Sequence, residues 1–261
     1  MTEKPLILLS NDDGYRAKGL RTLGVTLRKF ADVVICAPES EQSAQSHSLT
    51  LHKPLRLRNH DEGVFSVSGT PADCVYVALY SQTRVLPRKP DLVVSGINHG
   101  ANLGADVFYS GTVAAAREGA LRGIPSMAIS ADAAADPVAA AEMGMRIAKA
   151  MLEAPRPNED QSYAPLLNVN IPPGHAWPVQ VTSLGTRLYG EYIEFRKDPR
   201  GREYLWIGGG QVKHPEMAGS DTAAFDRGVV GVTPLLLDLT AHDRAPWAND
   251  VVNLLEPPPS A

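Results

Sequence analysis

Cysteine, aromatic residues and long apolar runs are all scarce in this chain of 261 residues. The two cysteines, Cys36 and Cys74, lie in apolar surroundings and far from a CxxC spacing. They are therefore expected to be buried free thiols, with neither a disulfide nor a zinc site. No apolar run approaches the ~20 residues that a membrane helix needs. No signal-peptide pattern is visible at the N-terminus, so we expect a cytoplasmic protein with no membrane partner.

An excess of positive charge is also lacking. The chain carries 25 Lys and Arg against 29 Asp and Glu, a formal net charge of -4. This balance argues against a general surface for a nucleic-acid polymer. With 44% hydrophobic residues, a chain of this length is able to bury one sizeable core.

Apolar runs and helical spacings alternate along most of the chain. A strand at 6–9, a helix at 17–30 and a strand at 33–36 form a βαβ unit, which implies a right-handed parallel crossover. Further strands are expected at 48–58 (half-buried), 64–67, 91–95, 126–130 and 166–171, and further helices at 70–80, 112–121 and 137–151. The pattern predicts a Rossmann-like α/β fold with a doubly wound, mostly parallel sheet.

The last third of the chain has a different pattern. Aromatic-rich runs flank Asp198-Pro199-Arg200-Gly201, which predicts a β-hairpin arm at about 186–210. Such an arm either packs against its own domain or reaches another subunit. We expect one domain over 1–261, with a core at about 5–172 plus 229–240 and a flexible tail at 250–261.

The segment Asn11-Asp12-Asp13-Gly14 follows the first buried strand directly. Open α/β sheets bind their ligands at the carboxyl ends of strands. Two adjacent carboxylates repel each other, and hard oxygen donors suit Mg²⁺, Mn²⁺ or Ca²⁺. The alternative is a helix N-terminus, because Asn and Asp are common caps.

A second polar segment runs from Ser95 to Thr112 and contains four glycines. Asn98 and Asn102 offer amide groups to an oxygen or a cation. Ser110-Gly111-Thr112 at a helix start offers hydroxyls, backbone N–H groups and a positive dipole end, which together predict a phosphate site. The segment lacks the P-loop ending GKS or GKT and the GxGxxG pattern. An ordinary capped loop is the alternative.

A third loop, 39–50, follows the second strand and is rich in serine. It would supply a hydroxyl ligand at the same sheet edge, or it is simply a solvated loop. His47 and His99 are the histidines in these loops. Either would bind phosphate or act as an acid, unless it is merely exposed to solvent.

These segments together resemble the SurE survival-protein family of metal-dependent 5′-nucleotidases. The resemblance spans roughly residues 6 to 240 and is carried by Ser10-Asn11-Asp12-Asp13-Gly14, Ser48-Leu49-Thr50, Gly69-Thr70-Pro71-Ala72-Asp73-Cys74, Ser95-Gly96-Ile97-Asn98, Gly100-Ala101-Asn102-Leu103-Gly104, the run from Tyr109 to Gly119, Leu167-Asn168-Val169-Asn170-Ile171-Pro172, Gly219-Ser220-Asp221-Thr222 and Val232-Thr233-Pro234-Leu235.

The resemblance implies a Rossmann-like core with one divalent metal ion, Mg²⁺ or Mn²⁺. It places the metal ligands at Asp12, Asp13, Ser43 and Asn98. It also implies a homodimer or homotetramer built partly by an exchanged C-terminal arm. The expected phosphate contacts are Asn11, Asn102, Ser110, Gly111 and Thr112.

This chain departs from the family pattern at two positions. Ala44 stands where relatives often carry glycine after the loop serine, which leaves Ser40 and Ser46 as alternatives to Ser43. His99 stands where relatives commonly have arginine. An imidazole would attract phosphate more weakly and with more dependence on pH than a guanidinium.

The expected activity is the hydrolysis of nucleoside 5′-monophosphates to nucleoside and phosphate, extending to 3′-nucleotides and short polyphosphate. Asp12 and Asp13 are the expected catalytic residues, with water as nucleophile or with an aspartate that is phosphorylated transiently. A haloacid-dehalogenase-type phosphatase is one alternative, although that class separates its two aspartates by one residue. A non-catalytic nucleotide-binding stress protein is the other.

Overall fold

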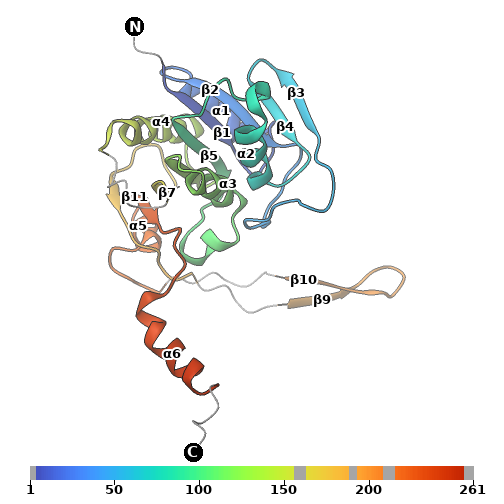
Figure 1. The fold of residues 1–261 in the computed structure, drawn as a ribbon, viewed down its shortest axis with the longest axis vertical. Coiled ribbons are helices and arrows are strands. Elements are labelled where there is room, and N and C mark those ends of the chain that lie inside the picture. The colour runs from blue at the N-terminus through green and yellow to red at the C-terminus, as the bar shows by residue number, and fades with distance from the viewer. Residues whose placement is uncertain (1–3, 156–162, 188–192, 208–214, 256–261) are drawn as a thin grey trace, which may run out of the picture.

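A nine-stranded sheet forms the centre of the computed structural model, which describes residues 4–155, 163–187, 193–207 and 215–255. The strand order is β3-β4-β2-β1-β5-β6-β7-β11-β8 (Figure 1). The six strands from β4 to β7 in this order are parallel, whereas β3 and β11 run antiparallel to their inner neighbours. The strands are β1 (Leu6–Ser10), β2 (Asp32–Pro38), β3 (Leu57–Asp61), β4 (Val64–Val67), β5 (Leu92–His99), β6 (Ser126–Ala131), β7 (Leu166–Ile171), β8 (Val179–Val181) and β11 (Val230–Leu235).

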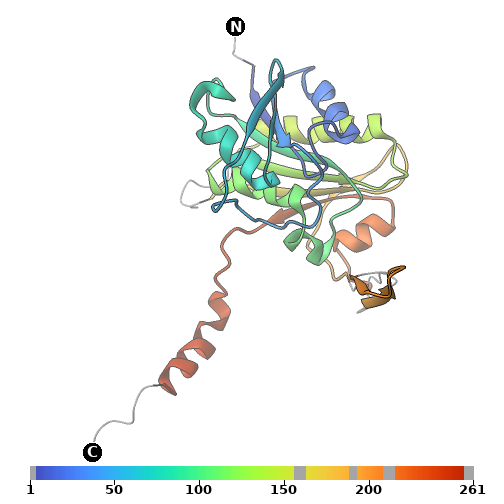
Figure 2. The same cartoon turned by 90° about the vertical axis from the view of Figure 1, so that its right-hand side faces the viewer.

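Helices cover both faces of this sheet (Figure 2). On one face, Ile7 and Leu9 of β1 pack into a core with α1 and α4. On the other, Leu6 and Leu8 belong to a core with α2 and α3. Alternate residues of one strand thus enter different layers, as a fully buried strand requires. The helices are α1 (Lys18–Leu27), α2 (Pro71–Tyr80), α3 (Gly111–Leu121), α4 (Pro137–Glu153), α5 (Asp221–Asp226) and α6 (Ala245–Asn253), with short 3₁₀ turns at Gln82–Arg84, Gly104–Phe108 and His242–Arg244.

The order of the strands creates a switch point beside β1. From β1 the chain moves to β2 and β4 on one side, and it then returns to place β5 on the other side. The connections after β1 and β5 therefore diverge at the carboxyl ends of these two strands, which is where open α/β sheets bind their ligands. The doubly wound, mostly parallel sheet that the sequence predicts is confirmed.

Both cysteines are buried free thiols, as predicted. The Cys36 thiol donates a hydrogen bond to the carbonyl oxygen of Cys74 at 3.3 Å. Burial raises the pKa of Cys36 to about 12, so this thiol is uncharged and unreactive at neutral pH.

The expected half-buried strand at 48–58 is wrong. The observed strand β3 begins at Leu57 and is exposed along its whole length. The earlier residues bond to the start of α2 instead: Asp73 accepts from the backbone and hydroxyl of Thr50, and Thr70 donates to the carbonyl oxygen of Ser48. Because these backbone groups are satisfied by a helix terminus, they do not join a strand ladder.

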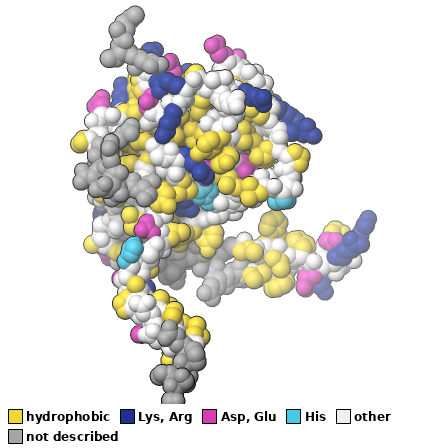
Figure 3. Space-filling model, in the orientation of Figure 1, with side chains coloured by type: hydrophobic (Ala, Val, Ile, Leu, Met, Phe, Trp, Pro, Cys, Tyr) yellow, Lys and Arg dark blue, Asp and Glu magenta, His cyan; other side chains and the backbone are white. Residues whose placement is uncertain are grey.

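Two elements project from the body of the molecule (Figure 1). The hairpin predicted at about 186–210 is confirmed as a separate two-stranded sheet of β9 (Ile193–Lys197) and β10 (Glu203–Ile207), whereas 188–192 and 208–210 lie outside the described residues. Its pairing places Phe195 opposite Leu205 and Ile193 opposite Ile207. All four are exposed, and hydrophobic side chains are visible along the arm in Figure 3.

The helix α6 extends in another direction and was not predicted. It includes residues 250–253 of the expected flexible tail, whereas 256–261 lie outside the described residues. Over the described ranges, none of the helices is both long and apolar enough to cross a membrane.

Candidate active site

The turn after β1 is held by the first polar residue of the acidic segment. The Asn11 amide donates to the carbonyl oxygen of Gly14 at 3.1 Å, and Gly14 has a φ of +95°, where glycine is unstrained. Asn11 is fully buried, and its amide oxygen has no hydrogen-bond partner among the described residues. The following helix begins later, with Ala17 at its N-cap and no side-chain cap. The alternative of a capping role for this segment at α1 is therefore wrong.

Asp12 is buried against the start of α3. The hydroxyl of Thr112 donates to one Asp12 carboxylate oxygen, and the backbone N–H of Thr112 also donates to this side chain. Ser110 is the N-cap of α3 and accepts from the N–H of Val113 at 3.1 Å. The positive end of an eleven-residue helix thus faces a carboxylate. The predicted helix start at Ser110-Gly111-Thr112 is confirmed.

Gly111 lets the start of α3 pack closely against Asp12, just after the end of β1. A Cβ atom at this position would lie 2.8 Å from Cβ of Asp12 and 3.0 Å from its Oδ2. Only glycine lets the helix terminus come this close to the carboxylate. The backbone of Gly111 leaves room for Asp12. It also orients the N–H groups of the first turn of α3, which have no partner within the helix.

The end of β5 supplies the next group of residues. Gly96 has a φ of +140°, and a Cβ atom there would meet the carbonyl oxygen of Ile129 at 2.3 Å. Beyond it, the half-buried Asn98 donates its amide N–H to the carbonyl oxygen of Gly100 at 2.8 Å. Because the amide nitrogen is engaged, the amide oxygen is the atom that would serve a cation. The backbone N–H of His99 donates to Asp13, which joins the end of β5 to that of β1.

The two aspartates are electrostatically unfavourable neighbours. Burial raises the pKa of Asp12 above its ordinary value, even though the Thr112 hydroxyl counteracts this. Burial and then the charge of Asp12 raise the pKa of Asp13 to about 6. Glu41 adds a further negative charge near both. A cation bound between these groups would relieve both the desolvation and the repulsion.

The loop after β2 brings its serine to the same edge. The N–H of Gln42 donates to the carbonyl oxygen of Asp12 at 2.8 Å, so the loop lies against the acidic segment. The next residue, Ser43, is exposed, and its hydroxyl donates to Glu41 at 2.8 Å. Ala44 has a φ of +56°, a conformation that glycine adopts without strain. This backbone explains why glycine suits the position after Ser43.

Asn102 is clamped by two buried asparagines of β7. Its N–H donates to Asn170, and its carbonyl oxygen accepts from Asn168 and Asn170 at 2.9 and 3.0 Å. The Asn102 side chain donates to Ser130 at the end of β6. Sequence reasoning did not assign Asn168 and Asn170 this role, although their alternation with apolar residues in a buried strand was a usable signal.

The donor set at this edge fits a hard divalent cation. Over the described ranges, no three His, Cys, Asp or Glu side chains converge on a metal position. A cation bound by Asp12 and Asp13 would therefore need neutral oxygens as further ligands, and Asn98 and Ser43 on the neighbouring loops offer an amide oxygen and a hydroxyl. Carboxylate, amide and hydroxyl oxygens with several waters suit Mg²⁺ or Mn²⁺.

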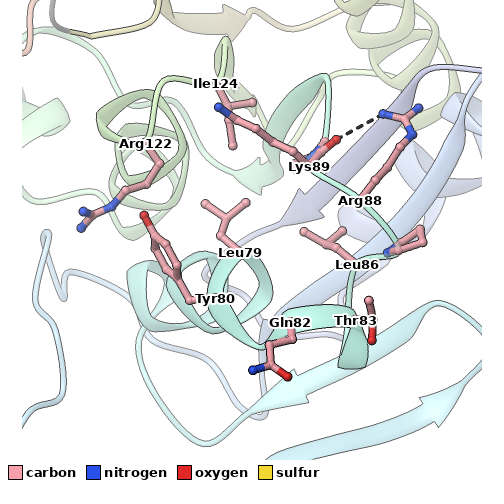
Figure 4. Close-up of a pocket in the computed structure, with 11 residues that line it drawn as sticks. Leu79, Tyr80, Gln82, Thr83, Leu86, Arg88, Lys89, Arg122 and Ile124 are labelled. Atoms are coloured by element: carbon pink, nitrogen blue, oxygen red, sulfur yellow. Dashed lines mark hydrogen bonds between the residues drawn. The ribbon is translucent and has the colours of Figure 1, made fainter.

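A separate cavity lies at the opposite edge of the sheet (Figure 4). It has a volume of about 440 Å³ and is bordered by residues at the ends of α2 and α3 and before β5, among them Leu79, Tyr80, Leu86, Lys89 and Arg122. Because parallel strands begin at this edge, the cavity is remote from Asp12 and takes no part in the site.

Comparisons of this chain with family profiles, with named proteins and with solved structures all find the same family. The profile of the family "Survival protein SurE" matches residues 7–191. A protein named 5′-nucleotidase SurE from Sorangium cellulosum is 63% identical over 238 residues, which cover 91% of this chain and 92% of that protein. Its namesake from Myxococcus xanthus is 44% identical over 98% of this chain and 99% of its own. The crystal structure of the SurE protein from Aquifex aeolicus matches with a TM-score of 0.80 and 36% identity, covering 97% of this chain and 100% of that one.

Replacing Asp13 with asparagine should stabilise the metal-free protein at neutral pH. A carboxyl pKa raised to about 6 in the fold means that the fold binds this proton more tightly than the unfolded chain does. The free energy of unfolding of the wild type therefore falls as pH rises from about 4 to about 6. A variant with a neutral amide at this position would not show this fall. In EDTA at pH 8, we expect Asp13→Asn to raise Tm by about 2–4 °C, the shift that 1 kcal/mol gives at this size.

The Tm difference should shrink toward pH 4, and added Mn²⁺ should stabilise the wild type more than the variant. An unchanged or lower Tm for Asp13→Asn at pH 8 in EDTA would contradict the electrostatic description of the pair.

The substitution Gly111→Ala should disturb Asp12 without unfolding α3. The added methyl group would displace the carboxylate, and the loss of support for a metal ligand commonly costs about 10- to 100-fold in affinity. We expect a loss of this size in Mn²⁺ affinity, measured by electron paramagnetic resonance, with an unchanged circular dichroism spectrum. Wild-type affinity in this variant would show that α3 does not support Asp12.

Proposed function

We propose that this chain, which belongs to the SurE survival-protein family, is a 5′-nucleotidase that hydrolyses nucleoside 5′-monophosphates to nucleoside and phosphate. The observation that carries this proposal is the pair Asp12 and Asp13 at the end of β1, directly against the N-terminus of α3. A cation site beside a helix N-terminus is suited to a phosphoryl group, because the cation and the helix N–H groups can bind different oxygens of that group. The names of the relatives support the same activity.

We further propose that one divalent cation, Mg²⁺ or Mn²⁺, is held by Asp12, Asp13, Asn98 and Ser43. A bound cation supplies Lewis-acid stabilisation of the charge that develops on the phosphoryl oxygens. Asp12 is the more rigid ligand, because Thr112 fixes its carboxylate from the side chain and the backbone. The contact of Asp13 with the N–H of His99 orients the second carboxylate toward the end of β5.

The phosphate would lie at the first turn of α3. Ser110 and Gly111 present a hydroxyl and a backbone N–H at the positive end of the helix. Thr112 and Asn11 support this position indirectly, since Thr112 bonds to Asp12 and Asn11 holds the turn after β1. We assign Asn102 a further phosphate contact, made from a segment that Asn168 and Asn170 hold in place.

Hydrolysis also requires a group that accepts a proton from water. Asp13 is half-buried, whereas Asp12 is buried, so Asp13 is the carboxylate that water reaches more easily. We assign it the role of base, with water as the nucleophile. The contacts described all concern the phosphate, so 3′-nucleotides and short polyphosphate are proposed as further substrates.

The sequence is compatible with two other functions. A haloacid-dehalogenase-type phosphatase is set aside, because the aspartates are adjacent and the chain belongs to a different family. A non-catalytic nucleotide-binding protein would retain the cation and phosphate contacts but release no phosphate, so an activity measurement distinguishes it.

Purified protein should release phosphate from AMP or GMP with Mg²⁺ or Mn²⁺, and EDTA should abolish this release. Asp12→Asn should lower the rate by about 10²-fold or more, because it removes a charge that the cation requires. The matched control is Asp32→Asn, the same change at the exposed start of β2, which should leave the rate unchanged. Absence of phosphate release from all nucleotides and from polyphosphate would refute the enzymatic proposal.

We also propose that the chain forms a homodimer or homotetramer through its hairpin arm. A two-stranded hairpin is marginally stable by itself, and Ile193, Phe195, Leu205 and Ile207 share one exposed face. Such a face is typical of an interaction surface.

Introducing charge on this face should dissociate the assembly. We expect Phe195→Glu combined with Leu205→Glu to give a mass near the 28.0 kDa of one chain by light scattering, and the wild type a twofold or fourfold multiple. Val25→Glu, at an exposed apolar position on α1, is the control and should leave the assembly intact. A double variant with the wild-type mass would contradict the proposal.

A further inference from the structure

The loop that carries Ser43 has a backbone that its own sequence does not favour. Ala44 and Ser46 both have positive φ values, +56° and +52°, which cost free energy for residues other than glycine. The tip of the loop, residues 43–45, is largely exposed, so packing does not hold it. Its conformation must therefore be imposed by contacts on either side.

These flanking contacts attach the loop to two different elements. Before the tip, the N–H of Gln42 donates to the carbonyl oxygen of Asp12 at 2.8 Å. After the tip, Ser46 donates from its N–H to Tyr109 at 3.0 Å and from its hydroxyl to Phe108 at 2.6 Å. The next residue, His47, brings its Nε2 within 2.8 Å of Oε2 of Glu118 on α3.

Glu118 provides a fixed attachment point for the loop, because its side chain is only 1% exposed. Its second oxygen accepts from Nε and Nη2 of Arg122 at 2.8 Å each. Burial by itself would raise the pKa of Glu118, but the bonds from His47 and Arg122 hold it below its ordinary value. When a buried carboxylate loses one of two such partners, its negative charge is no longer fully compensated, which destabilises the fold.

The helix α3 connects this anchor to the acidic pair. Its first turn packs on Asp12 through Gly111 and Thr112, and Glu118 lies two turns further along. The His47–Glu118 contact therefore fixes the loop relative to the same rigid element that fixes Asp12. The distance between Ser43 and Asp12 therefore depends on two contacts of α3, the bond from Thr112 to Asp12 and the contact of Glu118 with His47.

We propose that His47 is a positioning residue of the candidate metal site, and that it holds Ser43 in place by bonding to the buried carboxylate of Glu118. This role rests on the proposed function only through the assignment of Ser43 as a ligand. Arg122 provides a contrast, because it compensates the same carboxylate but contacts Tyr76 and Tyr80 of α2 instead of the loop.

The test is a double-mutant cycle on the Mn²⁺ dissociation constant of the purified full chain, measured by electron paramagnetic resonance. We expect Ser43→Ala and His47→Ala each to weaken binding by about 10-fold, as is common for ligands and their supports. The double variant should be no weaker than Ser43→Ala, because His47 acts through Ser43. His47→Gln, which keeps an N–H donor for Glu118, should restore most of the affinity.

Arg122→Ala is the matched control for a purely structural effect. It should lower Tm and leave Mn²⁺ affinity unchanged, because it removes a partner of Glu118 without releasing the loop. If His47→Ala does not fold, His47→Ser takes its place in the cycle.

Three results would overturn the proposal. The first is a loss of Mn²⁺ affinity in the double variant equal to the product of the two single losses. The others are a loss in Arg122→Ala equal to that in His47→Ala, or no loss in Ser43→Ala. If AMP hydrolysis is absent while the coupling between Ser43 and His47 persists, the proposed function fails and the positioning role stands.

Discussion

The burial of two adjacent carboxylates, Asp12 and Asp13, at the end of β1 sets the requirements that the surrounding structure has to meet. Two carboxylates at the end of a buried strand are costly in free energy, because each loses water and each opposes the charge of the other. Burial raises the pKa of both carboxyl groups, and the charge of Asp12 raises that of Asp13 further. The surrounding fold offers partial compensation through the N–H and O–H donors of Thr112 and the N–H of His99. A divalent cation is the further compensation that this arrangement calls for.

The fold gathers the remaining groups by topology rather than by sequence proximity. The switch point beside β1 brings the end of β5 next to the acidic segment, and α3 then returns with its N-terminus against Asp12. Gly111 and Gly96 permit approaches that any side chain would block. The same helix anchors the serine loop through Glu118. Asp12, the first turn of α3 and the serine loop, to which we assign cation and phosphate binding, are thus connected through one helix.

Much of this arrangement is predictable from local patterns. The apolar run before Asp12 indicates a buried strand, and the Ser110-Gly111-Thr112 segment indicates a helix start because its residues favour a cap. The hairpin follows from its turn residues. In each case a few neighbouring residues contain the whole signal, and the structure confirms the element. The pairing of Ser43 and Asn98 as metal ligands stays a prediction.

Other features depend on partners that are distant in sequence. The clamp of Asn168 and Asn170 on Asn102 requires knowledge of the strand register. Residues 48–56 do not form the expected strand because Asp73 and Thr70, more than twenty positions later, bond to their backbone. The direct bond between Thr112 and Asp12 joins residues a hundred positions apart, so no local pattern in the sequence indicates it.

The most direct test of this account is a crystal structure of the protein soaked with Mn²⁺, with anomalous scattering used to locate the ion. We expect one Mn²⁺ per chain, within bonding distance of Asp12 and Asp13, with oxygens of Asn98 and Ser43 as further ligands. An ion bound elsewhere, or no ion between the two carboxylates at saturating Mn²⁺, would contradict it.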